Sequence, residues 1–463
     1  MSLFIDTKEY TSLHFAGILG SGMSAVAQFA RWKGIDVSGS DRLIDRGGGG
    51  VVRSGLEEMG CRLVAQDGGG IGPNTQAVVV STAVEKDNRD ILAARERGIP
   101  VLHRSDVVAA LVKTHRGVAV AGTSGKSSVA AVIFELLRAC GKNPSLITGA
   151  PLVALAEEGY IGNAWAGRSD LLIVEADESD GSLVRYTPDI AVFLNVSKDH
   201  QPVDETLGMF GRLASRSRMV FVNADEPLLE SIPADRTFGF TEEASFRAEA
   251  LRSDGEGVTF RCLGTDFTLR QPGAHNASNL LAALSVCSYL DCKPSELVRA
   301  AGGLRGIRRR FTVVSNRGGI RVVDDYAHNP AKIAAALRAA HLSARRVLAL
   351  FQPHGFGPTR FLKKDLAAVF STELSAPDVL YLLPIYDAGG TAQRDISSGD
   401  IADSMGHATC VVHVLGDRRE ALQAVATEAA DGDCIICMGA RDPTLEAFAR
   451  EIANAVGGEP GAQ

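Results

Sequence analysis

The chain has 463 residues, of which 45% are hydrophobic and 22% are charged. This length exceeds what one core of usual size can organise, so we expect about three domains of about 150 residues each. The formal net charge is −7 and no basic tail is present, which argues against nucleic acid as a partner. Anionic ligands must therefore be held by local groups.

The start of the chain lacks the features of a secretory leader. Residues 1–8 show no positive segment followed by an apolar core and a small-residue cleavage site, and no apolar run reaches the about 20 residues that span a bilayer. We therefore expect a cytoplasmic protein with no membrane partner, either a monomer or a homodimer.

The eight cysteines are spread along the chain, and we expect them to be reduced and buried. Cys434 and Cys437 form the one close pair. They lie in an apolar run that is typical of a buried strand, which we favour over a metal or redox role.

The first segment alternates strands and helices. We expect strands at 13–19, 35–39 and 76–81, helices at 23–33 and 105–113, and loose loops at the glycine clusters 47–50 and 68–70. This pattern predicts a Rossmann-like domain over residues 1–114.

Two further segments follow. Strands at 118–121, 171–174, 190–196 and 219–222, short antiparallel strands within 241–270 and a helix at 276–290 predict a P-loop ATPase-like mixed sheet over 115–310. A hairpin at 311–323 and strands at 347–351, 379–383 and 434–438 predict a second Rossmann-like domain over 311–463. The fold class is thus α/β with three domains.

A glycine-rich loop joins the strand at 118–121 to the next helix. Its sequence is Gly122-Thr123-Ser124-Gly125-Lys126-Ser127-Ser128. Backbone N–H groups at such a helix start hold phosphate oxygens, Lys126 adds a cation, and Ser127 offers a hydroxyl to Mg²⁺. Val120 stands where the full phosphate-loop motif has its first glycine, so an ordinary turn is the alternative.

Acidic residues follow the strand at 171–174. Glu175 comes directly at its end, where an α/β sheet presents ligands, and its carboxylate suits Mg²⁺. A solvated acidic loop is a reasonable reading for Asp180. His200 follows the next strand and reaches the same edge, although a histidine there is more often structural.

Later in the chain, polar side chains stand at the start of one helix and at the ends of two strands. Asn276 and Asn279 share one helical face, where their amides either hydrogen-bond to a purine base or cap the helix. In the last segment, Asp325 and His328 follow one strand and His354 and Arg360 follow another. Two adjacent strand ends that supply such groups indicate a functional site.

The glycines near the N-terminus predict another anion site. Gly17-Ile-Leu-Gly20-Ser-Gly22-Met-Ser24 opens a helix, and Asp41 lies about 20 residues on, where a ribose hydroxyl acceptor is expected. The spacing G-x-x-G-x-G differs from the dinucleotide pattern. This spacing argues against a nicotinamide cofactor but remains compatible with binding of another nucleotide.

Taken together, the motifs resemble those of the Mur ligases, which are ATP-dependent enzymes of peptidoglycan precursor synthesis, over nearly the whole chain. The supporting segments are 17–24, Ser38-Gly-Ser-Asp41, Ser81-Thr-Ala-Val-Glu-Lys-Asp-Asn88, Glu175-Ala-Asp-Glu-Ser-Asp180, Arg309-Arg-Phe311, Asp324-Asp-Tyr-Ala-His328 and Phe351-Gln-Pro-His354. The resemblance implies an ATP-dependent amide ligase that joins an amino acid, L-alanine by preference, to the carboxylate of UDP-N-acetylmuramate.

The resemblance also implies a role for each motif. UDP-sugar would bind at Gly20, Ser21, Gly22, Met23, Ser24, Asp41 and Ser81. ATP would bind at 122–128, Asn276, Asn279, Arg310 and Asp325, with Mg²⁺ at Ser127, Glu175 and His200. The amino acid would bind at His328, His354 and Arg360, and Lys126, Glu175, His200, His328 and Arg360 would serve catalysis. A carbamoylated lysine, used by several related ligases, is not expected, since no lysine occurs between Lys198 and Lys293.

Two departures leave the amino acceptor open. Ser124 stands where the alanine-adding subgroup usually has histidine, and Gly355 and Pro358 stand where it has arginines. The alternatives are a related ligase that adds a recycled tripeptide or uses another acceptor, a nicotinamide-dependent dehydrogenase, and an inactive nucleotide-binding module.

Overall fold

A computed structural model describes residues 3–5, 7–198, 201–387, 393–406 and 408–457. The chain divides into two compact units, and each is described by itself. The first unit comprises 1–249, 261–267 and 278–308, and the second comprises 250–260, 268–277 and 309–463.

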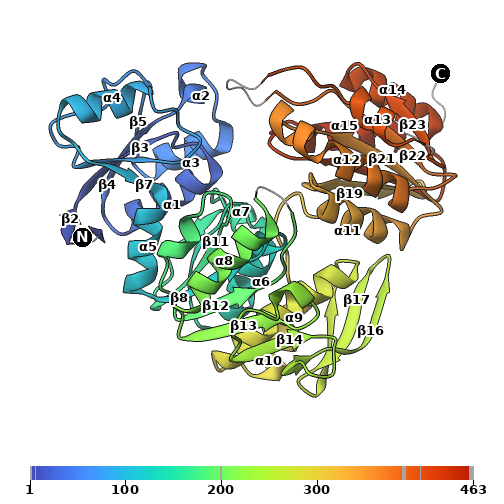
Figure 1. The fold of residues 1–463 in the computed structure, drawn as a ribbon, viewed down its shortest axis with the longest axis horizontal. Helices are drawn as coiled ribbons and strands as arrows, with labels where there is room; N and C mark the ends of the chain where they lie inside the picture. The colour runs from blue at the N-terminus through green and yellow to red at the C-terminus, as the bar shows by residue number, and fades with distance from the viewer. Residues whose placement is uncertain (1–2, 6, 199–200, 388–392, 407, 458–463) are drawn as a thin grey trace. The chain divides into compact units, whose positions relative to one another are not determined.

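The first sheet of the first unit is a parallel sheet that follows a short hairpin of β1 (Leu3–Ile5) and β2 (Lys8–Tyr10) (Figure 1). Its strand order is β5-β4-β3-β6-β7. The strands are β3 (Ser12–Ala16), β4 (Asp36–Ser40), β5 (Arg62–Val64), β6 (Ala77–Val80) and β7 (Val101–His103), and the helices are α1 (Ser21–Trp32), α2 (Arg42–Asp45), α3 (Gly50–Glu58), α4 (Arg89–Glu96) and α5 (Arg104–Thr114). The order reverses between β3 and β6, and ligands bind at such a reversal.

The second sheet has eight strands in the order β10-β9-β11-β8-β12-β13-β14-β15. The strands are β8 (Arg116–Ala121), β9 (Ser145–Ile147), β10 (Ala164–Trp165), β11 (Leu171–Ala176), β12 (Ile190–Phe193), β13 (Met219–Asn223), β14 (Arg236–Gly239) and β15 (Phe246–Arg247). Only β10 pairs antiparallel with its neighbour among these described strands. The carboxyl ends of β8, β11 and β12 therefore meet at one edge.

The rest of the chain between residues 122 and 308 forms helices and a small separate sheet, whose strands are divided between the two units. They are α6 (Lys126–Ala139), α7 (Val153–Glu157), η1 (Ser182–Arg185), α8 (Val203–Ala214), η2 (Pro227–Leu229), α9 (Ala274–Tyr289) and α10 (Pro294–Ala301), with β16 (Glu249–Asp254), β17 (Gly257–Cys262) and β18 (Thr265–Leu269). Short strands are present within 241–270, as expected. One of them, β15, is not antiparallel as expected, because it pairs parallel with β14 at the edge of the second sheet.

The third sheet has six strands in the order β19-β20-β24-β21-β22-β23. The strands are β19 (Thr312–Arg317), β20 (Ile320–Asp325), β21 (Arg346–Gln352), β22 (Val379–Leu382), β23 (Val411–Val414) and β24 (Asp433–Gly439), and the helices are α11 (Pro330–His341), α12 (Phe356–Glu373), α13 (Gly399–Ser404), α14 (Arg418–Glu428) and α15 (Leu445–Val456). The hairpin expected at 311–323 is β19 and β20, which pair antiparallel.

Apolar packing explains the third sheet. On β21, Val347, Ala349 and Phe351 belong to one buried cluster, while Leu348 and Leu350 belong to another. Side chains alternate along a strand, so this continuous apolar run buries both faces. Cys434 and Cys437 lie in β24 with 0% and 1% exposure, which confirms the buried-strand reading.

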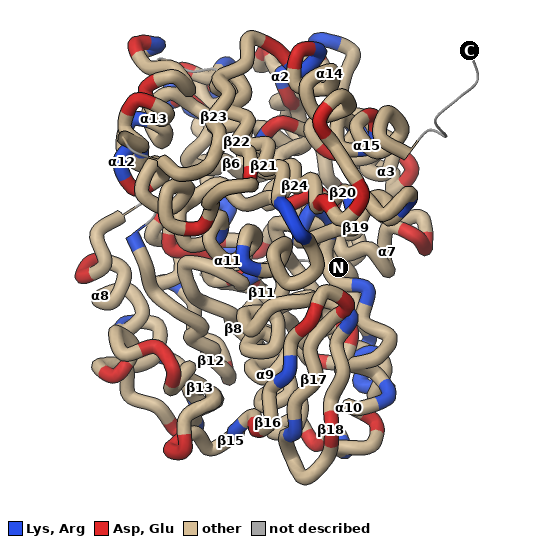
Figure 2. Tube along the Cα trace, turned by 90° about the vertical axis from the view of Figure 1, so that its right-hand side faces the viewer, with Lys and Arg blue, Asp and Glu red and all other residues tan. Residues whose placement is uncertain are grey.

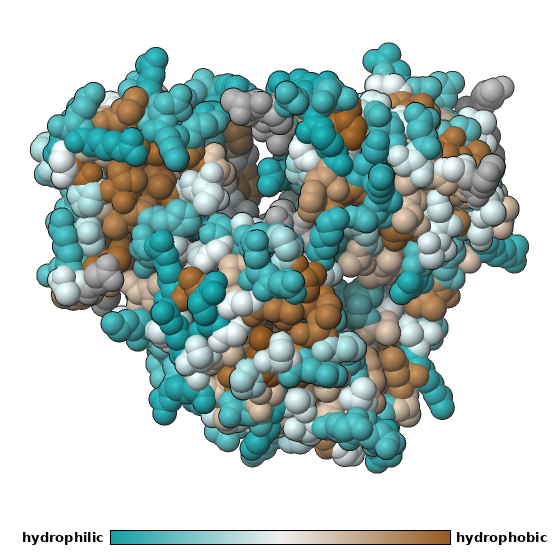
Figure 3. Space-filling view, viewed as in Figure 1, coloured by the Kyte–Doolittle hydropathy of each residue, from teal (hydrophilic) through white to brown (hydrophobic). Residues whose placement is uncertain are grey.

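The three-domain α/β expectation agrees with these sheets. One local expectation was wrong: Gly50 is the first residue of α3 rather than part of a loose loop. None of the described helices is long and apolar enough to cross a membrane. Figure 2 shows Lys and Arg segments interspersed with Asp and Glu segments, and Figure 3 shows hydrophilic side chains around apolar patches on the visible face.

Candidate functional site

The phosphate loop joins β8 to α6. Gly122 has φ +150° and Gly125 has φ +86°, conformations that favour glycine. A Cβ on Gly122 would lie 3.0 Å from the Leu194 Cβ, so the loop packs closely on the segment after β12. Gly125 is the N-cap of α6 and supplies no side-chain cap, which leaves the first N–H groups of the helix available to an anion.

Asn195, which the sequence analysis did not single out, holds the phosphate loop. Its Oδ1 accepts from the Ser124 N–H at 2.9 Å, and its Nδ2 donates to the Ser124 carbonyl at 3.0 Å. Thr123 adds two bonds to the same segment, since its hydroxyl donates to the Ser197 carbonyl at 3.2 Å and accepts from the Ser197 N–H at 3.0 Å. The buried Ser124 hydroxyl has no partner among the described residues.

We predict that Asn195→Ala raises the KM for ATP about tenfold, because two backbone hydrogen bonds worth about 0.5–1.5 kcal/mol each are lost from the loop. Asn195→Asp keeps the acceptor and loses the donor, so it should have an intermediate effect. ATP titrations of initial rate measure both. An unchanged KM in Asn195→Ala would show that the loop holds its shape without this side chain.

Lys126 begins α6 and lies among acidic groups. Its Nζ donates to the Gly122 carbonyl at 2.8 Å and to Glu178 Oε2 at 2.7 Å, and it lies 3.6 Å from Asp177. Burial opposes its charged form, but Glu178, Asp177 and Glu175 outweigh burial and raise the pKa of Lys126. Burial raises the pKa of Glu178 more than Lys126 lowers it. The close Nζ to Oε2 contact favours a charged lysine facing the loop.

Glu175 is the penultimate residue of β11, one residue inside the strand rather than just after it as expected, and it lies near the carboxyl end of that strand. Its Oε1 accepts from the Thr148 hydroxyl and from the Gly149 N–H, the latter at 2.8 Å. The carboxylate lines a cavity of about 130 Å³ in the first unit, together with Ser21 and Gly22 at the start of α1. A carboxylate therefore lies close to both predicted anion sites of this unit.

Arg104, also not singled out from the sequence, lines the same cavity. Its guanidinium lies directly against Gly22, where the Cβ of any other residue would overlap Nη1, and it donates to Asp180 Oδ2 at 3.2 Å. Asp180 also accepts from the Ser182 N–H at 2.9 Å. Asp180 is thus a paired residue rather than a solvated one.

The turn before α1 is tied to the strand ends of the first sheet. The Gly17 and Ile18 N–H groups donate to the Ser40 carbonyl, and Asp41 Oδ2 accepts from the Leu19 N–H at 3.1 Å. Asp41 Oδ1 caps α2 through the Leu43 N–H at 3.0 Å. Asp41 therefore already shapes the predicted nucleotide turn, and any bond to a ribose would use its remaining lone pairs.

Polar groups on α1 bond to Asn163 of the loop before β10. Asn163 Nδ2 donates to the Ser21 carbonyl at 2.7 Å and to the Ser24 hydroxyl at 2.9 Å, and Gln28 donates to Asn163 Oδ1 at 2.7 Å. Ser24 and Met23 are buried. Of the predicted sugar-binding residues, Gly20 and Ser21 are exposed, and Gly22 and Ser81 are partly exposed.

The two asparagines of α9 have different surroundings. A Cβ on Gly125 would lie 2.7 Å from Asn279 Oδ1, so Asn279 lies against the phosphate loop. The Asn276 side chain donates to the Pro272 carbonyl at 2.7 Å, one turn earlier. In an N-cap the side-chain oxygen accepts from a helix N–H, so this donated bond from a residue inside α9 supports neither the capping nor the purine alternative.

In the second unit, Asp325 organises the segment that enters the third sheet. Its Oδ2 accepts from the Phe311 N–H and its Oδ1 from the Ala327 N–H, both at 2.7 Å. Burial raises its pKa despite the cation of Arg310. The Arg310 guanidinium lies 5.3 Å from the centre of the Tyr326 ring, which is a cation–π contact.

His328 and His354, which follow β20 and β21, come together with ring centres 5.1 Å apart. The expectation that their strands are adjacent was wrong, because β24 lies between β20 and β21. His328 Nδ1 lies 2.8 Å from the Tyr326 carbonyl, which can only accept, so Nδ1 carries the hydrogen and Nε2 keeps its lone pair. Burial, with help from Lys332 and His354, lowers the pKa of His328 well below its usual value. His328 is therefore neutral near pH 7 and able to accept a proton or a hydrogen bond.

Arg360 lies in the first turns of α12. It pairs with Asp395 and donates to the Gln393 carbonyl at 3.1 Å. Gly355 is the N-cap of α12 and has φ +69°, and Pro358 lies within its first turn. Of positions 355, 358 and 360, only 360 carries a guanidinium, and that of Arg360 is already paired with a carboxylate.

The predicted metal ligands can be tested in part. His200 lies outside the described residues. Ser127 lies in the first turn of α6, which follows β8, and Glu175 lies near the end of β11, the strand that pairs with β8. Hydroxyl and carboxylate oxygens are donors that Mg²⁺ prefers, so these two residues fit the ion.

Comparison with known proteins gives consecutive matches to three family models. These are the Mur ligase family catalytic domain at residues 12–116, the Mur ligase middle domain at 120–287 and the Mur ligase glutamate ligase domain at 309–441. Proteins named UDP-N-acetylmuramate–L-alanine ligase align with it at 36% identity in Paenarthrobacter aurescens and 35% in Thermosynechococcus vestitus. These alignments cover 96% and 92% of this chain and 97% and 92% of the relatives.

Solved structures share the fold. The UDP-N-acetylmuramate–alanine ligase of Thermotoga maritima has a TM-score of 0.78 at 23% identity, covering 96% of this chain and 98% of that one. A murein peptide ligase from Psychrobacter arcticus has a TM-score of 0.69 at 21% identity, covering 98% and 100%. With the full-length relatives and all three family models in agreement, the chain belongs to the Mur ligase family.

Proposed function

We propose that this chain is an ATP-dependent ligase that joins L-alanine to the carboxylate of UDP-N-acetylmuramate in peptidoglycan precursor synthesis. The observation that supports this most is the 36% identity, over 96% of the chain, to a relative that bears this name. Lys126 in a glycine loop beside Glu175 suits phosphoryl transfer to a carboxylate. We also propose that the reaction takes place in the cytoplasm.

The first step activates the sugar carboxylate. One carboxylate oxygen attacks the γ-phosphorus of ATP, and the bond from this phosphorus to the β,γ-bridging oxygen breaks. ADP departs, and the sugar carboxylate has become an acyl phosphate. The N–H groups at the start of α6 and the Lys126 ammonium stabilise charge on the transferring group. Ser127 and Glu175 offer oxygen ligands to Mg²⁺, which when bound would neutralise further charge on the phosphates.

The second step forms the amide. The neutral amine of the amino acid attacks the acyl carbon, the tetrahedral intermediate collapses, and inorganic phosphate leaves as the amine loses a proton. His328 and His354 are the residues that we assign to the amino acid, together with Arg360. His328, neutral and with an Nε2 lone pair, suits a hydrogen bond from the incoming ammonium or amine.

The remaining assignments complete this proposal. We assign the UDP-sugar to the start of α1, Asp41 and Ser81, and ATP to 122–128, Asn276, Asn279, Arg310 and Asp325. His200 completes the metal ligands in this proposal. The corresponding domains are residues 1–114, 115–310 and 311–463, which bind the UDP-sugar, ATP and the amino acid respectively.

A second candidate is a ligase that attaches a preformed peptide to the same sugar. Gly355 and Pro358 offer no guanidinium, and Arg360 is paired with Asp395, so these three positions offer a free α-carboxylate no guanidinium that lacks a carboxylate partner. A peptide, whose carboxylates lie farther from its reacting amine, depends less on cations at this position.

The prediction is that phosphate release with ATP, Mg²⁺ and UDP-N-acetylmuramate is fastest with L-alanine. The measurement is initial rate over a panel that includes glycine, L-serine, D-alanine and a tripeptide beginning with L-alanine, with product mass as the control for true ligation. Faster ligation of the tripeptide by tenfold or more would replace alanine addition with the second candidate. Turnover no faster than in Lys126→Met with every acceptor would contradict both.

A further inference from the structure

A carboxylate in the middle of α6 holds a distant segment of the chain. Glu135 Oε2 accepts from the Arg305 N–H at 2.9 Å, and its Oε1 accepts from the Gly306 N–H at 3.1 Å. These partners lie 170 and 171 residues further along the chain. Since α6 begins at Lys126 of the phosphate loop, Glu135 joins the helix of that loop to residues 305 and 306.

The segment at 305–308 is fastened to the first unit by further backbone bonds. Gly306 is buried with φ +67°, a left-handed conformation that favours glycine, and its carbonyl accepts from the Val153 N–H at 3.0 Å. The Arg308 N–H donates to the Pro151 carbonyl at 3.1 Å. Arg308 ends the last part of the first unit, so the segment is fastened up to the point where the chain leaves that unit.

Arg309 begins the last part of the second unit, and its bonds lie there. Its Nε donates to Asp324 Oδ2 at 3.1 Å, its Nη2 donates to the Gly439 carbonyl at 2.9 Å, and its carbonyl accepts from the Tyr326 N–H at 2.7 Å. Arg310, which we assign to ATP, is the next residue. The anchorage of the chain therefore changes from one unit to the other immediately before a proposed ATP ligand.

The cations near Glu135 have other carboxylate partners. Arg138, one turn later on α6, forms two contacts of 2.9 Å with Glu158. The Arg305 side chain pairs with Glu157 at 2.6 Å, although its backbone N–H donates to Glu135. In the described part of the chain, Glu135 therefore holds backbone N–H groups rather than the cation of a salt bridge.

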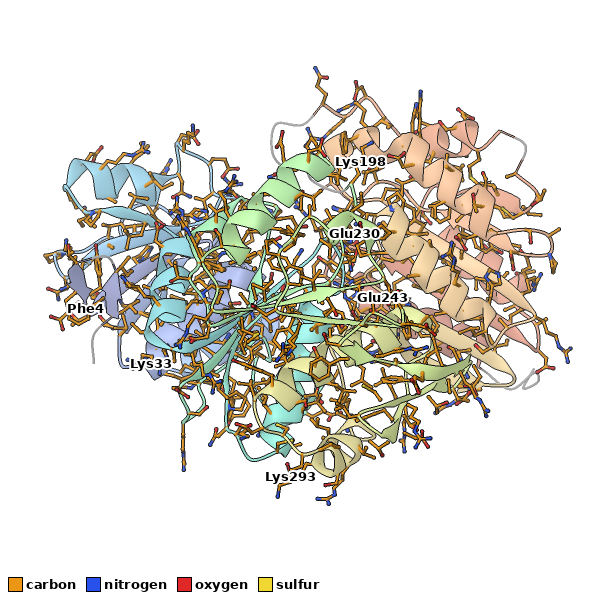
Figure 4. The ribbon with its side chains drawn as sticks, turned by 60° about the horizontal axis from the view of Figure 1, so that its bottom comes forward. Phe4, Lys33, Lys198, Glu230, Glu243 and Lys293 are labelled. Atoms are coloured by element: carbon orange, nitrogen blue, oxygen red, sulfur yellow. The ribbon has the colours of Figure 1, made fainter. Side chains whose placement is uncertain are left out.

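A cavity of about 320 Å³ lies beside Glu135 and is lined by residues of α6 and α10, among them Ala139, Glu296 and Arg299. Glu296 Oε2 accepts from the Lys293 N–H at 3.0 Å, and Lys293 points outward from the ribbon in Figure 4. Ala139 and Arg299 are exposed, so water reaches this cavity. Burial nevertheless raises the pKa of Glu135 to about 7. A carboxylate is thus costly here, and the two N–H bonds offset part of that cost.

We propose that Glu135 is a positioning residue for ATP binding, which fixes residues 305–308 to α6 and thereby sets the backbone position from which Arg310 follows. A carboxylate has two acceptor oxygens, one for each N–H group, and hydrogen bonds to an ionised acceptor are about twice as strong as neutral ones. Glu135 acts through the segment that it holds, so it has no catalytic role here. The inference rests on the proposed function for the assignment of Arg310 to ATP.

Hydrogen exchange with site-resolved fragmentation tests the two hydrogen bonds in the full-length protein. Glu135→Leu removes both acceptor oxygens, and we expect protection of the Arg305 and Gly306 amides to fall about tenfold, with protection in β8 and β11 unchanged. Glu135→Gln keeps one acceptor oxygen and should lose less protection. It decides the matter alone if Glu135→Leu does not fold. Unchanged protection at both amides in a folded variant would overturn the proposal.

Equilibrium binding separates positioning from a general structural role. We expect the Kd for ATP to rise about tenfold in Glu135→Leu and about threefold in Glu135→Gln, whereas the Kd for UDP-N-acetylmuramate should stay within about twofold of wild type. A merely structural residue would instead lower the fraction of protein that binds either ligand. Such an equal loss for both ligands, or an unchanged Kd for ATP, would overturn the proposal. Binding is measured without turnover, so a failure of the proposed ligation leaves this test intact.

Glu157→Gln is the matched control on the same segment. Glu157 pairs with the side chain of Arg305 rather than with its backbone, and the two side chains are 52% and 54% exposed. Such an exposed pair contributes little, so amide protection and both Kd values should match wild type. If Glu157→Gln raised the Kd for ATP as much as Glu135→Leu does, the Arg305 side chain would be the positioning group and the assignment to Glu135 would be wrong.

Discussion

Lys126→Met is expected to lower ATP-dependent phosphate release by about 10²- to 10³-fold, because the ammonium that stabilises charge on the transferring phosphoryl group is removed from a largely buried loop. Methionine keeps much of the side-chain length without the charge. The measurement is kcat and KM for ATP with saturating UDP-N-acetylmuramate and L-alanine. We expect the loss mainly in kcat, since the cation acts most strongly on the transition state.

Removal of Lys126 also leaves Glu178 and Asp177 without their cation, so folding must be checked by thermal unfolding. Lys364→Ala, an exposed lysine on α12, serves as the control and should retain wild-type activity. A folded Lys126→Met enzyme with activity within tenfold of wild type would remove Lys126 from the proposed reaction.

Glu175→Gln is expected to reduce kcat about 10²-fold and to raise the Mg²⁺ concentration needed for half-maximal rate. The amide oxygen can still accept from the Thr148 hydroxyl and the Gly149 N–H, so the local structure should persist. The lost negative charge weakens the attraction for a divalent cation. Initial rates across a Mg²⁺ titration at saturating ATP measure both effects.

Glu158→Gln is the matched control for this carboxylate. Glu158 pairs with Arg138 through two contacts of 2.9 Å, and both side chains are more than a third exposed, so its loss should change stability and activity little. If the Mg²⁺ dependence of Glu175→Gln matched that of Glu158→Gln, Glu175 would have no role in holding the ion.

Local sequence pattern was sufficient where chemistry follows a strand directly. Lys126 could be predicted because its glycine loop follows the apolar run of β8, and Glu175 because it comes directly after the apolar run at 171–174. The carboxyl ends of these neighbouring parallel strands meet. The rings of His328 and His354 are in contact as expected, but β24 lies between β20 and β21, which were expected to be adjacent strands. Gly50 shows the limit of composition alone, since a glycine cluster was taken for a loop and begins a helix.

Other site residues had no local signal. These residues form hydrogen bonds with partners far away in the sequence. The separation is 71 residues between Asn195 and Ser124 and 142 residues between Asn163 and Ser21. It is 76 residues between Arg104 and Asp180. Each is a polar residue in or beside a loop, a setting in which sequence pattern does not separate a solvated side chain from a structural one. Their partners became identifiable only when the strand order was known.

The sequence by itself determined the α/β class, the phosphate loop and the family resemblance, because these depend on hydrophobic period and on short motifs whose residues are neighbours in the chain. Tertiary structure alone decided which side chains share the cavity beside Glu175 and how the glycine loop is held by Asn195. The physical reason is that such contacts arise from the packing of distant segments, which local periodicity does not encode.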